Sequence, residues 1–306
     1  MKIAFMGTPA LAVPCLDALA KQHEIAVVVT QPDKIGGRRN HQLIVPPVKT
    51  RALEIGAPVL QRARARDESF IEELRAYAPD AIAVVAFGQI LPQAILDLAP
   101  RGCVNLHFSL LPRWRGAAPA QYAIWNGDQI TGVTTQWMAA KLDAGDIIQQ
   151  LEVPIEPTET GGELLERLTP IGAQVLTQTF AMLENNSAPR VPQDETGVTL
   201  APQIDKDAVQ VEWTMDAEKI VNTARAWNPW PGAWCLHKGE PLKIWRAEVV
   251  ELGGEAGTIV ELTKVGPIVA AGEKAVQLLE VQAPGKPRMS AADWARGVRL
   301  EVGAKF

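Results

Sequence analysis

An asparagine and a histidine, Asn105 and His107, stand two positions apart in a short apolar run. On a β-strand successive side chains point to opposite faces, so these two polar groups share one face and their apolar neighbours share the other. An amide can donate a hydrogen bond to a developing oxyanion, and an imidazole can move protons near pH 7. The pair offers what acyl transfer needs, although a buried structural histidine beside a turn-starting asparagine fits the pattern equally well.

A second polar cluster, residues 141–146, contains two carboxylates and a glycine after an apolar run. Such loops are often simple turns, because Asp hydrogen-bonds its own backbone. A carboxylate beside an imidazole favours the imidazolium and orients the ring, so a pairing of Asp143 with His107 would give the cluster a chemical role. The spacing along the chain leaves that pairing open.

The elements that must position these residues follow from the alternation of apolar runs and helical patterns in the first half of the chain. Helices are predicted around residues 11–19 and over 162–183, and strands over 3–6, 25–30, 81–87, 104–108, 131–138 and 147–155. This alternation is typical of an α/β domain with a Rossmann-like, mostly parallel sheet. Ligands of such sheets bind at the carboxyl ends of the strands, where Asn105 and His107 fall.

The second half of the chain has another pattern. Residues 186–206 are rich in Asn, Pro, Asp, Gln and Thr, which predicts a linker. Short strands separated by Gly- and Pro-containing turns are predicted over 209–213, 234–237, 242–250, 257–262 and 275–281. We therefore expect a catalytic domain over residues 1–185 and a small C-terminal β-barrel of OB type over residues 207–306.

Composition excludes several classes of protein. Hydrophobic residues make up 47% and charged residues 21% of the chain, and its apolar runs fall far short of the ~20 residues of a membrane span. No signal peptide is recognisable, so we expect a cytoplasmic protein that does not bind a membrane. Its net charge of −5 argues against a broadly basic nucleic-acid binder. The three cysteines show no metal-ligand spacing, so we expect no metal. A turn at residues 7–9 lacks the dinucleotide-binding fingerprint, which argues against a dinucleotide cofactor.

These motifs together resemble the folate-dependent formyltransferases. The resemblance rests on NLHFSLLPRWRGAAP at residues 105–119 and LDAGD at residues 142–146. Further stretches are similar to the branch of the family that acts on initiator methionyl-tRNA: GTP at 7–9, TQPD at 30–33, PVK at 47–49, NPWP at 228–231 and MSA at 289–291. The similarity extends over nearly the whole chain.

The resemblance implies roles for the chemical groups. The substrate amine would attack the formyl carbon of 10-formyltetrahydrofolate, Asn105 and His107 would stabilise the tetrahedral oxyanion, and Asp143 would assist His107. It implies no metal and no covalent enzyme intermediate. The folate would lie along two segments and the loop before Asp143, and the residues implied are Phe87, Gly88, Gln89, Ile90, Leu91, Ser109, Leu110, Leu111, Pro112, Lys141 and Leu142.

For the tRNA, the resemblance implies a basic loop after the second strand, which here contains Arg38 and Arg39. Arginine suits phosphate through its planar donor fork. The loop departs from the family pattern at Asn40 and His41, where lysines are usual. Further contacts with the tRNA are expected from Arg113, Arg115, Lys286 and Arg288.

Two larger residues near the site depart from the family as well, Phe108 in place of a small residue and Lys141 in place of a glycine. Three other functions remain open at this point. They are formyl transfer to a small amine, folate hydrolysis, and non-catalytic RNA binding on an enzyme scaffold. A monomer is expected.

Overall fold

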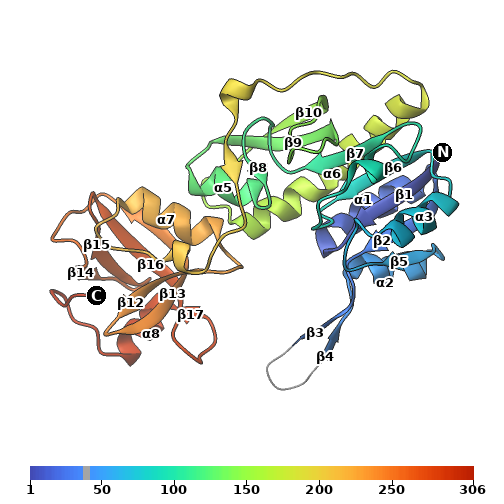
Figure 1. Ribbon diagram of the computed structural model, residues 1–306. Coiled ribbons are helices and arrows are strands. Elements are labelled where there is room, and N and C mark those ends of the chain that lie inside the picture. Colours follow the sequence, from blue (N-terminus) through green and yellow to red (C-terminus); the bar gives the residue numbers. More distant parts are fainter. Residues whose placement is uncertain (37–41) are drawn as a thin grey trace. The chain divides into compact units, whose positions relative to one another are not determined.

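The computed structural model describes residues 1–36 and 42–306, and these divide into two units (Figure 1). The first unit comprises the described part of residues 1–119 together with residues 131–153 and 165–201. The second comprises residues 120–130, 154–164 and 202–306. The first unit therefore continues well beyond residue 185, where the sequence predicted its end.

A seven-stranded sheet forms the centre of the first unit, in the order β10-β9-β7-β6-β1-β2-β5. Its five strands from β7 to β5 are parallel, and β9 runs antiparallel to β7. This arrangement confirms the predicted Rossmann-like sheet. The strands are β1 (Lys2–Gly7), β2 (Glu24–Thr30), β5 (Val59–Gln61), β6 (Ala81–Val85), β7 (Cys103–His107), β9 (Ile130–Trp137) and β10 (Ile147–Pro154).

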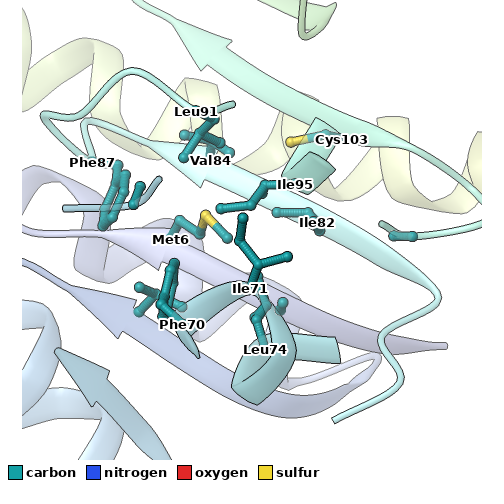
Figure 2. Packing of buried hydrophobic residues seen from close by; sticks show 14 of the residues in the cluster. Met6, Phe70, Ile71, Leu74, Ile82, Val84, Phe87, Leu91, Ile95 and Cys103 are labelled. Atoms are coloured by element: carbon teal, nitrogen blue, oxygen red, sulfur yellow. The ribbon is translucent and has the colours of Figure 1, made fainter. Parts of the chain in front are cut away.

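Helices cover this sheet and bury its apolar strands. All five residues of β6 are buried, as expected for a parallel strand covered on both faces. In α3, Phe70, Ile71 and Leu74 recur at helical spacing and pack into a cluster with Met6 and other strand residues (Figure 2). The helices are α1 (Val13–Ala20), α2 (Pro47–Glu54), α3 (Glu68–Ala76), α4 (Gln93–Leu96) and α6 (Gly161–Glu184), after a 3-10 turn at Ala10–Ala12.

The basic loop after β2 contains a two-stranded antiparallel ribbon, β3 (Lys34–Gly36) and β4 (Gln42–Ile44). Lys34 lies opposite Ile44, and Ile35 lies opposite Leu43. Arg38 and Arg39 lie outside the described residues, as do Asn40 and His41. Their expected contact with tRNA therefore stays a prediction.

An antiparallel sheet forms the centre of the second unit, in the order β12-β13-β16-β15-β14 with β17 beside β16. The sequence predicted a small β-barrel of OB type here, and the structure shows a C-terminal domain built on an antiparallel sheet. Its strands are β12 (Ala233–His237), β13 (Glu240–Val250), β14 (Ile259–Leu262), β15 (Pro267–Ala270), β16 (Ala275–Gln282) and β17 (Met289–Ser290), and its helices include α5 (Pro119–Trp125), α7 (Ala217–Ala226) and α8 (Ala291–Gly297).

One predicted strand of the second unit is wrong. Within the predicted strand 209–213, Val209 ends a 3-10 turn, Asp207–Val209, and Gln210 makes a single isolated bridge to Trp234 in place of a ladder. Val209 and Val211 are both buried, which gives the alternation of a strand without its pairing. The sequence also missed α7 and α8, whose buried positions are largely small alanines.

Candidate active site

Strand β7 carries Asn105 and His107 in the middle of the sheet, beside β6 and β9. Asn105 lies opposite Val84 on one side and Gln136 on the other, and His107 lies opposite Thr134. Both side chains are buried. The two polar groups therefore stand near the carboxyl end of a parallel strand, where α/β sheets bind their ligands.

The imidazole of His107 has a different environment at each nitrogen. Its Nε2 lies 2.9 Å from the carbonyl oxygen of Trp114. Because a carbonyl oxygen only accepts hydrogen bonds, Nε2 is assigned the ring proton and donates this hydrogen bond. Its Nδ1 lies 3.8 Å from Oδ2 of Asp143. That distance is too long for a direct hydrogen bond. Nδ1 is therefore the nitrogen that remains for chemistry, and it faces a carboxylate.

Asp143 is held in place through both carboxylate oxygens. Oδ2 accepts a hydrogen bond from the backbone N–H of Gly116 at 2.9 Å, and Oδ1 accepts one from Nε2 of Gln136 at 3.1 Å. Its backbone has a φ of +47°, in the left-handed region that non-glycine residues rarely adopt. The structure thus brings Asp143 to His107, as the family resemblance implied, and it does so in a strained backbone conformation.

Gly145 makes the Asp143 loop possible. A Cβ at this position would lie 1.6 Å from the carbonyl oxygen of Trp137, a distance that no side chain could occupy. The backbone N–H of Trp137 in turn donates to the carbonyl oxygen of Asp146 at 2.9 Å. The close approach of two backbone segments explains why the motif LDAGD requires a glycine at this point.

Gln193, in the segment predicted to be a linker, is a residue of the site that the sequence missed. Its Nε2 donates to the backbone carbonyls of Asp143 and Gly145, each at 2.8 Å. Its Oε1 accepts from Nε and Nη2 of Arg115 at 3.0 and 2.8 Å. One amide therefore joins the Asp143 loop to Arg115. No motif signals this, since a polar residue in a polar segment is equally typical of a linker.

Arg115 does not lie on the surface expected for a tRNA contact. Its side chain is 2% exposed, and Nη2 also donates to Oε1 of Glu195 at 2.9 Å. The structure therefore contradicts the assignment of Arg115 to the RNA surface. Hydrogen bonds from Arg115 and then from Lys141 lower the pKa of Glu195 to about 2. Lys141, expected beside the folate, is thus exposed and paired with a carboxylate.

The loop at residues 114–116, which holds both His107 and Asp143, is supported by residues 199–201. The backbone N–H of Trp114 donates to Oγ1 of Thr199 at 2.8 Å, and that of Arg115 donates to the Thr199 carbonyl at 2.9 Å. Strand β8 (Arg115–Gly116) pairs in parallel with β11 (Leu200–Ala201). Residues 193–201 therefore form a support for the site.

The segment after β7 is anchored by polar side chains of β9 and β10. Thr134 Oγ1 donates to the Ser109 carbonyl at 2.6 Å, and Gln150 Nε2 donates to the Leu111 carbonyl at 2.8 Å. The side chains of Ser109 and Leu111 are buried, while Leu110 and Pro112 are partly accessible. Two of the four expected folate contacts in this segment therefore have side chains that are already enclosed by protein.

In the segment after β6 too, some of the expected folate contacts are buried and others are exposed. The Phe87 carbonyl accepts hydrogen bonds from Thr8 Oγ1 and Gln31 Nε2 at 3.1 and 3.2 Å, and Phe87 and Leu91 belong to the core (Figure 2). Gln89 donates to the Arg62 carbonyl at 2.9 Å. Ile90, in contrast, is 82% exposed, and Gly88 has a φ of +81°. In the other loop, Leu142 is 60% exposed.

The remaining residues assigned to tRNA are on the surface. Arg113 is exposed in the first unit, and Lys286 and Arg288 are exposed in the second. The guanidinium of Arg288 lies 3.5 Å from the ring centroid of Trp245, a cation–π contact. Within residues 1–36 and 42–306, no cluster of three His, Cys, Asp or Glu residues is suited to a metal ion. No described helix has the length and apolar character to cross a membrane.

Comparison with known proteins gives matches along the whole chain. Residues 1–180 match the formyl transferase family, and residues 203–299 match the formyl transferase C-terminal domain. The methionyl-tRNA formyltransferase of Moorella thermoacetica is 48% identical over 306 residues, covering 99% of this chain and 98% of the relative. That of Geobacillus thermodenitrificans is 46% identical over 311 residues, covering 99% and 97%.

Solved structures show the same fold at low sequence identity. The sugar 3N-formyl transferase WlaRD has a TM-score of 0.69 at 18% identity, covering 94% of this chain and 99% of that one. HypX from Aquifex aeolicus in complex with tetrahydrofolic acid has a TM-score of 0.67 at 17% identity, covering 99% and 48%. With the family matches and the full-length relatives, these findings show that the chain is an enzyme of the formyl transferase family, in the group whose members are named methionyl-tRNA formyltransferase.

Proposed function

We propose that this enzyme transfers the formyl group of 10-formyltetrahydrofolate to the α-amino group of initiator methionyl-tRNA in the cytoplasm. One observation carries the proposal. The loop at residues 114–116 receives a hydrogen bond from His107 through the Trp114 carbonyl and donates one to Asp143 through the Gly116 N–H. This loop fixes an imidazole and a carboxylate beside Asn105, in a chain similar over its full length to enzymes with that name.

The groups of the site fit direct attack by the amine. The amine nitrogen forms a bond to the formyl carbon, and the carbonyl oxygen becomes an oxyanion stabilised by the Asn105 amide and the His107 imidazole. The proton lost by the amine passes by way of His107 Nδ1, which lies 3.8 Å from the Asp143 carboxylate. The bond from the formyl carbon to folate nitrogen then breaks, and that nitrogen takes a proton as tetrahydrofolate leaves.

Side chains that could bind 10-formyltetrahydrofolate, the formyl donor, are exposed on two loops of the chain. Ile90 and Leu142 expose apolar side chains, which suit the flat ring system of a folate, and Leu110 and Pro112 are partly accessible. Phe87, Leu91, Ser109 and Leu111 shape these loops from within. We therefore assign folate contact to the exposed members of the expected set and positioning to the buried ones.

For the tRNA, the proposal retains Arg113, Lys286 and Arg288, which are exposed, and excludes Arg115, which is buried. Arg38 and Arg39 remain proposed contacts. Because the chain has a net charge of −5, binding of RNA would depend on such local groups and would weaken with added salt.

The test is an assay of acceptor choice. The protein is incubated with 10-formyltetrahydrofolate and, separately, with charged initiator tRNA, uncharged tRNA, an amino-sugar nucleotide and glycinamide ribonucleotide. We expect formylation of the charged tRNA alone. Formylation of a small amine at a higher kcat/KM, or release of formate without an acceptor, would contradict the proposal.

A further inference from the structure

The outer face of β12 carries apolar side chains where a solvent-facing strand position is usually polar. Along this strand Ala233, Cys235 and His237 are buried, whereas Trp234 and Leu236 alternate with them and remain accessible. Leu236 is 47% exposed. Because alternate residues point to opposite faces, two large apolar groups lie on the outer side of the sheet.

The strand register extends this surface across three strands. Trp234 lies opposite Lys243 of β13, and Lys243 lies opposite Gln282 of β16. Leu236 lies opposite Pro241. Directly opposite side chains are close enough to act together, so an indole, an ammonium and an amide form one row.

These residues line a hollow in the second unit, together with Trp230 and Lys206, with a volume of about 730 Å³. Small-molecule sites have volumes of about 300–1,000 Å³. Trp230 is 55% exposed, whereas the Trp234 indole is fixed by a hydrogen bond to the Lys206 carbonyl at 3.1 Å. The hollow therefore offers one accessible and one fixed indole.

The charge of the hollow is positive. Lys206 and Lys243 are among its lining residues, and the lining residues that the structure describes include no carboxylate. Burial lowers the pKa of Lys243, and the neighbouring charges of Lys206 and Arg288 lower it further. Lys243 thus lies close enough to two other cations to be repelled by them, and an anionic ligand would relieve that repulsion.

We propose that this hollow, the indole pocket, binds one unstacked nucleotide of an RNA, with its base on the tryptophan side chains and its phosphate near Lys206 and Lys243. Aromatic platforms beside cations are the usual way to bind single-stranded nucleic acid. A proline-rich peptide also suits an aromatic groove, but it brings no negative charge. That the RNA is a tRNA rests on the proposed function.

The experiment measures binding of the full-length protein to a hexanucleotide of adenosines and to the same backbone without bases. The variants are Trp230→Ala and Leu236→Gln, with Leu262→Ala as control, since Leu262 is an exposed leucine of the same unit outside the pocket. Base stacking supplies about 1–3 kcal/mol per base. We expect Trp230→Ala and Leu236→Gln to raise the Kd for the hexanucleotide about 5- to 100-fold while the Kd for the backbone stays the same.

A second pair of variants tests the phosphate contact. Lys243→Gln should weaken binding of both probes, and Lys264→Gln, an exposed lysine outside the pocket, should weaken neither. Equal loss at the control leucine, no preference of the parent for bases, or binding of a proline-rich decapeptide in place of RNA would overturn the proposal. Because the readout is binding and not formylation, a failure of the pocket and a failure of the proposed acceptor are seen separately.

Discussion

Replacing Gln193 by alanine should destabilise the fold and lower turnover, without changing the binding of either substrate. The loss of stability follows from the hydrogen bonds of Gln193. The change removes two hydrogen bonds to the carbonyls of the Asp143 loop and one of the two side-chain acceptors of the buried Arg115 guanidinium. Each lost bond costs about 1 kcal/mol, and an unsatisfied buried donor costs about 1–3 kcal/mol more. We therefore expect a loss of about 3–5 kcal/mol in the free energy of unfolding.

The effect on catalysis follows from the position of Asp143. A displacement of about 1 Å in a catalytic group can reduce the rate about 10²-fold, so kcat of the Gln193→Ala enzyme should fall by about that factor. The KM values for folate and tRNA should stay near those of the parent, because the Gln193 contacts described above are all with protein groups. Steady-state kinetics with each substrate varied in turn measures both quantities.

Two further variants separate positioning from general instability. Gln193→Glu keeps an acceptor for Arg115 but places a carboxylate against two carbonyl oxygens, so stability should recover more than turnover. Gln203→Ala changes an exposed glutamine ten positions further along the chain and should alter neither. Parent-like kcat in Gln193→Ala, or equal losses of kcat in all three variants, would refute the argument.

The remaining predictions concern five residues. His107→Ala should fold but lose about 10²- to 10⁴-fold in turnover, and near-normal turnover would remove its catalytic role. Gly145→Ala should destabilise the protein in thermal unfolding, because its Cβ would lie 1.6 Å from a carbonyl oxygen. The pKa of Glu195 is lowered from 4.5 to about 2, so its ion pairs stabilise the fold above about pH 4.5 and are lost as the pH falls towards 2. The difference in melting temperature between the parent and Glu195→Gln should disappear over that interval. Burial raises the pKa of the Cys15 and Cys235 thiols to about 12, so a thiol reagent at pH 8 should modify them only after unfolding.

Local signals placed Asn105 and His107 together, whereas the family resemblance, and not the spacing, implied that Asp143 lies beside His107. Alternation on one strand puts Asn105 and His107 on the same face, and a compact motif supplies Asp143. The partner of Arg115 could not be predicted in this way, because Glu195 lies 80 positions further along the chain. An arginine in an exposed-looking motif is usually on the surface, and only its tertiary contacts show that this one is buried.

The same contrast applies to the fold. Apolar runs located six of the seven strands of the first sheet, since a parallel sheet buries both faces of its strands. The three-residue strand β5 was not predicted, because three residues show no clear apolar run. Residues 209–213 have the alternation of a strand, but pairing depends on a neighbour that the local pattern does not describe. The sequence also did not predict α7 and α8, on whose buried faces alanine is the commonest residue.

The support at residues 193–201 has a consequence for protein engineering. A catalytic fragment cut at residue 185, the border that composition suggested, would lack Gln193 and Thr199 and with them the contacts that hold the catalytic loops. Exchange of C-terminal domains between formyltransferases should therefore join the chains after Ala201, the last residue of the first unit. The end of the catalytic unit is therefore set by residues 193–201, which contact the catalytic loops, and not by Glu184, where α6 ends.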